Sequence, residues 1–219
     1  MRSPSLTRRS RTVNGRIVSD YTWRGNVIGV HDSARNALLV IELFGDEQLV
    51  PEQKEPLLVR MLFEDPAGAA AMAGPELGDL LASIVWDAFG LDITADHEHA
   101  SEYEPPVFDW DEDAARIRAS LLQCYGINWD EASSSMTYLD LCSLLGSLLE
   151  SESETPFQQA IYYRTAKPPK PTKYNREMRE AFDARVRHYA LGQNRDKIEA
   201  QNAAMDDMFA AMKRAAKGA

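Results

Sequence analysis

The fold of this chain is decided by residues 108–164, which read FDWDEDAARIRASLLQCYGINWDEASSSMTYLDLCSLLGSLLESESETPFQQAIYYR. The first of three helix patterns in this stretch begins in an acidic cluster. Asp109 or Asp111 is its expected N-cap, because carboxylates are stabilised at the positive end of a helix. The pattern ends at Gly126, since glycine readily adopts the left-handed conformation of a helix end. Its apolar residues have the spacing of one buried face and are Ile117, Leu121, Leu122 and Tyr125.

Two further helix patterns complete this segment. The second carries a leucine stripe with i, i+3, i+4, i+7, i+8 spacing, made of Leu141, Leu144, Leu145, Leu148 and Leu149. Such a stripe must pack against neighbouring elements. The third pattern begins at Thr155, a natural N-cap, with Pro156 at the first helical position and Gln158 placed to complete a capping box.

Residues 16–31 predict a β-hairpin with its turn at Arg24-Gly25-Asn26. An isolated hairpin is marginally stable, so we expect helices to pack beneath it. Helix starts follow at Asp32 or Ser33, at Pro51 and at Pro75. The side chains expected to face inward are Ala37, Leu38, Val40, Ile41 and Phe44, then Leu57, Leu58, Met61 and Leu62, and then Leu77, Leu80, Leu81, Ile84, Val85, Trp86 and Phe89.

The chain is therefore predicted to be mainly α, a helical bundle with a short N-terminal β-hairpin and a long C-terminal helix. The expected parts are a disordered basic N-terminus (1–15), the hairpin plus helices (16–91), an acidic linker (92–107), the three-helix segment (108–164), a Pro-rich linker (165–172) and a C-terminal helical tail (173–219). Both linkers are recognised by composition, one polar and acidic, the other a proline-rich stretch that favours an extended chain.

Charge divides the chain into an acidic middle and two basic ends. The 219 residues have a formal net charge of −10. Residues 25–163 hold 26 acidic and 5 basic residues, a net charge of −21, whereas residues 1–24 carry +5 and residues 164–219 carry +6. Such a middle disfavours nucleic acid and favours a basic partner. A solvated acidic surface that only confers solubility explains the same composition.

Composition indicates a protein of the cytoplasm. No apolar run approaches the roughly 20 residues of a membrane span, and the start, MRSPSLTRRSR, lacks the apolar segment of a secretory signal. Cys124 and Cys142 lie in leucine-rich helix patterns, so we expect buried thiols in a reducing environment.

The sequence contains no motif of a familiar catalytic site. It has no Gly-rich phosphate loop, GxSxG elbow, HExxH or CxxC. His97 and His99 flank Glu98, but an acidic linker lacks the fixed surroundings that a metal site requires. Capping explains the aspartates of residues 109–113 without catalysis. We therefore expect no enzymatic activity, no cofactor and no metal.

The tail offers candidate partner-binding residues. One apolar stripe consists of Met178, Phe182, Val186 and Tyr189, and a weaker one contains Ile198, Met205, Met208, Phe209 and Met212. Methionine adapts to varied apolar surfaces. Met205, Met208, Phe209 and Met212 are therefore expected to contact a partner helix or groove. A helix that packs back on its own body is the alternative.

These features resemble the bacteriophage gene-product-fifteen family of tail-assembly chaperone-like proteins. The similarity is densest in residues 108–164, through Tyr125-Gly126-Ile127-Asn128, the aromatic and leucine helix from Tyr138, and the helix that ends in Tyr163-Arg164. It extends more loosely over residues 20–190, where Gly25 to Arg35 is similar to the family's hairpin running into a helix. The next similar segment is the helix from Leu57 to Phe63, which, as the resemblance implies, stops at Glu64-Asp65-Pro66.

The resemblance implies a non-catalytic chaperone in phage tail morphogenesis. Its implied partners are the tape-measure protein and the tail-tube protein, and its implied place is the host cytoplasm, with no part in the mature virion. The alternative is a nucleic-acid-associated or general phage adaptor protein that uses its basic termini. The acidic middle and the lack of aromatic residues among the N-terminal arginines disfavour nucleic acid.

Overall fold

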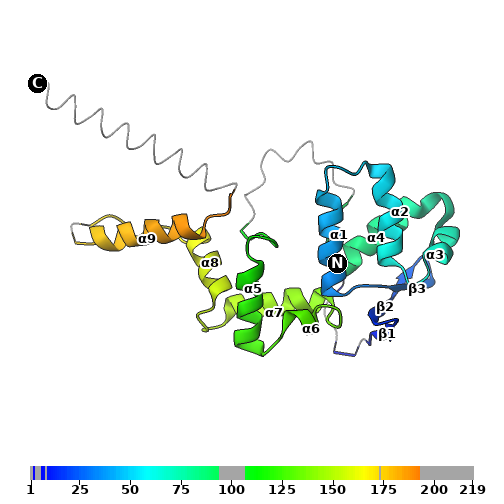
Figure 1. Cartoon of the computed structure of the whole chain (residues 1–219), viewed down its shortest axis with the longest axis horizontal. Coiled ribbons are helices and arrows are strands. Elements are labelled where there is room, and N and C mark those ends of the chain that lie inside the picture. Colours follow the sequence, from blue (N-terminus) through cyan, green and yellow to red (C-terminus); the bar gives the residue numbers. More distant parts are fainter. Residues whose placement is uncertain (1, 3–5, 8, 94–106, 173, 193–219) are drawn as a thin grey trace, which may run out of the picture. The chain divides into compact units, whose positions relative to one another are not determined.

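The computed structural model describes residues 2, 6–7, 9–93, 107–172 and 174–192 (Figure 1). The chain forms two compact units. Unit 1 comprises residues 1–101 and 121–153, and unit 2 comprises residues 102–120 and 154–219. Helix α5 (Ala114–Tyr125) contributes its first seven residues to unit 2 and its last five to unit 1. The predicted three-helix segment thus supplies residues to both units.

Unit 1 begins with a three-stranded antiparallel sheet. Its strands are, in spatial order, β1 (Arg11–Val13), β2 (Arg16–Trp23) and β3 (Asn26–Val30). Both connections are two-residue turns with positive φ, at Asn14-Gly15 and at Arg24-Gly25. Turns of this kind match the twist of the strands that they join. The predicted hairpin is confirmed. Residues 11–13, expected in a disordered N-terminus, instead form a strand because Asn14-Gly15 makes a second tight turn.

Helices make up most of the rest of unit 1. They are α1 (Ala34–Gly45), α2 (Pro51–Leu62), α3 (Pro66–Ala73), a 3₁₀ turn (Gly74–Glu76), α4 (Leu77–Phe89), the end of α5, α6 (Trp129–Ala132) and α7 (Tyr138–Glu150). Helix α1 contacts α2 and α7, and α4 contacts α7 and β2. Ser33 caps α1 by accepting a hydrogen bond from the backbone N–H of Asn36. Asp65 caps α3, so the signal that stops α2 also starts the next helix.

The leucine stripe of α7 contributes to the core of unit 1. Leu141, Leu145 and Leu148 are buried, as predicted, whereas Leu149 is exposed. Other fully buried large side chains of unit 1 are Val18, Tyr21, Val30, Val40, Leu62, Phe63, Leu80, Ile84 and Leu121. Trp86 of α4 is exposed, so the buried face of that helix is narrower than predicted.

Unit 2 combines the start of α5 with α8 (Pro156–Thr165) and α9 (Arg176–Tyr189). Thr155 caps α8, as predicted, by accepting a hydrogen bond from the backbone N–H of Gln158. Phe157 in the first turn of α8 is buried, and its backbone N–H donates to the hydroxyl of Ser120 on α5. Its ring contacts that of Phe108 edge to face, with 5.7 Å between the ring centroids.

Helix α9 packs on α8 through aromatic rings. The ring of Tyr163 stacks on that of Tyr189 and also contacts that of Phe182. The described part of the tail therefore packs within its own unit. The mainly α fold with a short N-terminal sheet is confirmed. A long C-terminal helix is not seen in the described residues, because α9 has 14 residues and ends at Tyr189. None of the described helices is long and apolar enough to cross a membrane.

Candidate functional site

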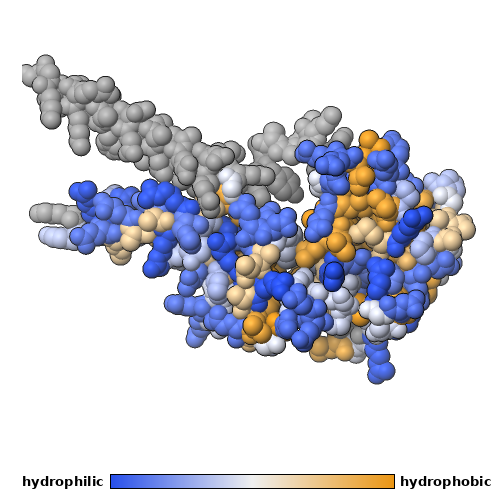
Figure 2. All heavy atoms as spheres, in the orientation of Figure 1, coloured by the Kyte–Doolittle hydropathy of each residue, from blue (hydrophilic) through white to orange (hydrophobic). Residues whose placement is uncertain are grey.

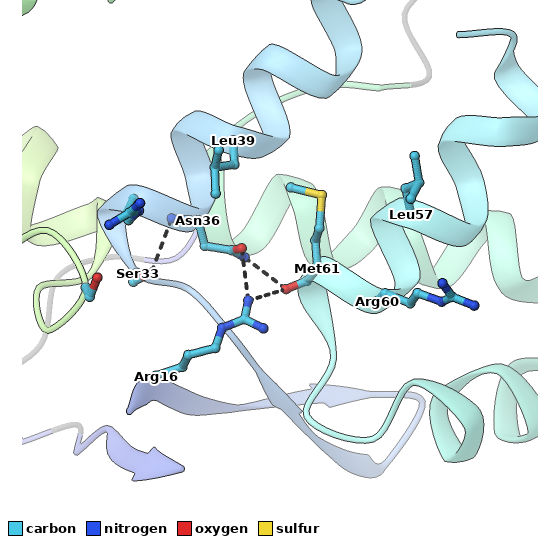
Figure 3. A pocket seen from close by; sticks show the side chains of 9 residues that line it. Arg16, Ser33, Asn36, Leu39, Leu57, Arg60 and Met61 are labelled. Atoms are coloured by element: carbon cyan, nitrogen blue, oxygen red, sulfur yellow. Dashed lines mark hydrogen bonds between the residues drawn. The ribbon is translucent and has the colours of Figure 1, made fainter. Parts of the chain in front are cut away.

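The candidate site is an open pocket of about 460 Å³ between α1 and α2 in unit 1 (Figure 3). It is lined by Arg16 of β2, by Ser33, Arg35, Asn36 and Leu39 at the start of α1, by Leu57, Arg60 and Met61 of α2, and by Ser134. Pockets that bind ligands have comparable volumes. We call this site the α1–α2 pocket.

The pocket has apolar walls because each helix leaves a leucine beside its buried face. Val40 of α1 and Leu58 of α2 are buried, whereas the preceding residues, Leu39 and Leu57, are 43% and 38% exposed. Consecutive helical residues point about 100° apart, so the residue next to a buried one lies at the edge of the core. The prediction that Leu57 faces inward is therefore wrong.

Further exposed apolar residues lie on α1 and just before α2. Phe44 near the end of α1 and Val50 just before α2 are both exposed. Figure 2 shows hydrophobic residues gathered in the region of α1 and α2. Single exposed apolar residues are ordinary on any protein surface, but a group of them on adjacent elements is typical of an interaction surface.

Arg16 forms a polar side of the pocket. Its Nη2 donates hydrogen bonds to the Asn36 side-chain oxygen and to the Met61 carbonyl, each 3.1 Å long (Figure 3). The Asn36 amide donates to the carbonyls of His31 and Met61, at 2.7 and 3.0 Å. Burial lowers the pKa of Arg16. The hydrogen-bond partners of this guanidinium are neutral oxygens.

Three arginines line the pocket. Arg35 and Arg60 are exposed, and neither they nor Arg16 form an ion pair within the part of the chain that the structure describes. The five basic residues of the acidic middle are Arg35, Lys54, Arg60, Arg116 and Arg118. Lys54 also belongs to α2, and its ammonium donates to the Phe44 carbonyl at the end of α1. The pocket therefore carries basic side chains within an otherwise acidic part of the sequence.

A second polar cluster of unit 1 holds the start of α1 against β2. The Tyr21 hydroxyl donates to the Asp32 carboxylate at 3.1 Å, and Nδ1 of His31 lies 3.2 Å from the Ile17 carbonyl. Burial raises the pKa of Asp32 and lowers the pKa of His31. None of these four residues lines the α1–α2 pocket. Their contacts indicate a structural role.

Unit 2 has a buried ion pair between Asp113, just before α5, and Arg164 near the end of α8. The Asp113 carboxylate is fully buried and accepts two hydrogen bonds from Arg164, at 2.5 and 2.9 Å, and one from Arg116, at 2.8 Å. Burial opposes ionisation of Asp113, but hydrogen bonds from Arg164, from the Asp109 backbone and from Arg116 outweigh it and lower the pKa of Asp113.

Arg164 also joins other parts of unit 2. It donates to the Val107 carbonyl at 3.1 Å and to the Tyr189 carbonyl at 2.5 Å. Asp109 accepts hydrogen bonds from the backbone N–H groups of Asp111 and Glu112 in the turn that precedes α5. Because α5 begins at Ala114, neither Asp109 nor Asp111 is the N-cap of this helix, and that prediction is wrong. The acidic cluster before α5 therefore serves local structure.

The residues predicted to bind a partner, Met205, Met208, Phe209 and Met212, lie outside the described residues, so their role stays a prediction. His97 and His99 also lie outside them. Among the residues that are described, no group of His, Cys, Asp and Glu is arranged to hold a metal ion. Cys124 and Cys142 are free thiols and are half-buried, whereas buried thiols were expected.

Sequence reasoning missed the arginines of the α1–α2 pocket. One signal was available: three of the five basic residues of the acidic middle lie between residues 35 and 60. That clustering marks the region but not the pocket, because only the structure shows that Arg16 of β2 joins Arg35 and Arg60.

The fold and the site together define a mainly α protein with a small antiparallel sheet and an open, apolar and basic pocket. A comparison with known protein families identifies it further. The chain belongs to the bacteriophage Gp15 protein family, whose family model matches residues 13–191. Searches of curated proteins and of solved structures found no significant match.

Proposed function

We propose that this protein is a tail-assembly chaperone, without catalytic activity, that binds the tape-measure protein in the host cytoplasm during tail morphogenesis. Tail-tube subunits are a further proposed partner. Membership of a bacteriophage family supports a role in the phage life cycle. The observation that carries the proposal is the α1–α2 pocket with its exposed leucines, Leu39 and Leu57.

The physical argument concerns helices that lack a packing partner. A long protein built of amphipathic helices exposes apolar stripes until it is assembled, and such stripes bind grooves between the helices of another protein. The α1–α2 pocket and the exposed Phe44 and Val50 offer apolar surface of this kind. A chaperone needs binding of this sort and no reaction centre.

Co-expression tests the proposal. The tape-measure protein of the same phage is produced with and without this chain, and its soluble fraction and co-elution in size-exclusion chromatography are measured. We expect this chain to raise the soluble fraction and to elute in a complex. A tape-measure protein that stays insoluble, or that is soluble but elutes alone, would contradict the proposal.

The basic ends of the chain favour a second function, binding to nucleic acid. Residues 1–24 carry +5 and residues 164–219 carry +6. Retention on immobilised DNA that falls steeply with salt, together with no complex in the co-expression test, would favour this function. Mass spectrometry of purified virions separates an assembly factor, which is absent from them, from a structural adaptor, which is present.

A further inference from the structure

We propose that the α1–α2 pocket binds a partner helix that carries carboxylates beside an apolar stripe. This inference extends the proposed function. It rests on that function for one point only, namely that the partner is a tail protein. The binding chemistry follows from the pocket itself.

The pocket presents apolar and basic side chains in helical register. On α1, Arg35 and Leu39 are four residues apart, and on α2, Leu57, Arg60 and Met61 are spaced i, i+3 and i+4. Residues with these spacings lie on one face of a helix. Figure 3 shows the Leu39 and Met61 side chains between the two helices, with the Arg16 guanidinium close to Asn36 and Met61. Two adjacent helix faces with apolar residues form the groove in which an amphipathic helix lies.

The positive charge of the pocket determines which charged residues the partner helix carries beside its apolar stripe. Arg16 is held by neutral oxygens, and Arg35 and Arg60 have no ion pair among the residues described. Carboxylates on the partner would supply counter-charges, and an arginine can donate two parallel hydrogen bonds to one carboxylate. A basic helix would be repelled at this site.

Nucleic acid fits the pocket less well than an acidic helix. Phosphates would also satisfy the arginines, but the residues that separate them, Leu39, Leu57 and Met61, provide apolar contacts that a phosphate backbone does not use. The surrounding residues 25–163, with a net charge of −21, repel an extended polyanion. A helix with a few carboxylates above its apolar stripe avoids most of that repulsion.

A pair of synthetic peptides tests the selection of charge. Both are helices of about 15 residues with leucine at every third or fourth position. At the positions that flank the leucines, one peptide carries glutamate and the other carries lysine. Fluorescence anisotropy measures their binding to the full chain. We expect the glutamate peptide to bind and the lysine peptide to bind at least about tenfold more weakly. Equal binding of both peptides would overturn the proposal.

Charge reversal locates the binding site. The double variant Arg35→Glu, Arg60→Glu is expected to weaken binding of the glutamate peptide by about tenfold or more. The matched control is Arg9→Glu with Arg187→Glu, which changes the net charge equally at exposed arginines outside the pocket. The control should change the Kd by less than about twofold at high salt, where distant charges are screened. Equal weakening in both variants would show that overall charge acts and not the pocket.

A third variant tests the apolar part, and circular dichroism checks that all variants are folded. Leu39→Ala with Leu57→Ala removes side chains that are already exposed, so the fold should persist while peptide binding weakens. Unchanged binding in this folded variant would overturn the role of the pocket.

The tape-measure complex separates this inference from the proposed function. If the complex forms with the unmodified chain and is lost in the Arg35→Glu, Arg60→Glu variant, both stand. A complex that survives the charge reversal overturns the pocket and leaves the chaperone function standing. Selective binding of the glutamate peptide at the pocket without any tape-measure complex overturns the chaperone function and leaves the binding chemistry of the pocket standing.

Discussion

Replacing Arg164 by alanine is predicted to destabilise unit 2 strongly. The Arg164 side chain is 8% exposed and that of Asp113 is 0% exposed, so the substitution leaves a buried carboxylate without its main partner. It also removes the donor to the carbonyls of Val107 and Tyr189. Breaking a buried ion pair by removing one partner costs about 3–5 kcal/mol. Arg116 keeps one hydrogen bond to Asp113, so we expect a loss near the lower end, about 3 kcal/mol.

Urea unfolding followed by far-ultraviolet circular dichroism measures this loss. Hydrogen exchange of peptides from α8 and the start of α5 shows whether it is confined to unit 2. The control is Arg176→Ala, because Arg176 and Glu180 form an ion pair with side chains 87% and 62% exposed. Exposed pairs of this type contribute little to stability, because solvent screens them. If Arg164→Ala costs no more than Arg176→Ala, the buried pair does not stabilise the unit and the reasoning fails.

The pH dependence gives an independent check on the same pair. The pKa of Asp113 is lowered from the ordinary 3.8, so ionised Asp113 stabilises the folded chain above this pH, and that contribution is lost as the pH falls through the lower folded value. Without Arg164, burial raises the pKa of the carboxyl group. The stability difference between the unmodified chain and Arg164→Ala should therefore narrow as the pH falls from about 7 towards 4. A difference independent of pH would show that lost packing, and not charge, causes the effect.

Two substitution pairs test other parts of the fold. Leu145→Ala, at a side chain that is 6% exposed in the leucine stripe of α7, should cost about 2–5 kcal/mol, whereas Glu152→Ala in the exposed connection to α8 should change stability by less than about 0.5 kcal/mol. Equal, small shifts of the urea midpoint would contradict burial of the stripe. Gly25→Ala should cost about 1–2 kcal/mol because φ is +83° in the turn between β2 and β3, whereas Gly78→Ala, in a helix with open space at the Cβ position, should stabilise by up to about 1 kcal/mol. Equal melting temperatures for the two alanine variants would refute the positive-φ turn.

Local signals predicted much of the fold from the sequence. Thr155 and the leucines 141, 145 and 148 lie where capping and spacing placed them, because caps and stripes depend on neighbouring residues in the chain. The turn at Arg24-Gly25 was found in the same way. The strand β1 was missed although Asn-Gly is a strong turn signal, because only three residues precede that turn within the strand.

The candidate site could not be predicted because it depends on contacts between distant parts of the chain. Leu57 lies next to the buried Leu58, and periodicity alone does not decide where the buried face of a helix ends. The hydrogen bonds from Arg16 to Asn36 and Met61 span 20 and 45 residues. The pairing of Asp113 with Arg164 spans 51 residues. No local pattern encodes these separations.

The acidic middle of the chain and its basic pocket act over different distances. At physiological salt the Debye length is about 8 Å, so exposed charges further apart than this interact weakly. A carboxylate in contact with Arg35 or Arg60 lies well within that distance, so the attraction between them persists at this salt concentration. The acidic residues of the middle act mainly at low salt, where they slow the approach of an acidic segment and attract basic ones. A partner with both acidic and basic stretches would therefore be oriented by the acidic middle before the pocket binds its acidic helix. The salt dependence of the association rate then reports the first effect, and the dissociation rate of the Arg35→Glu, Arg60→Glu variant reports the second.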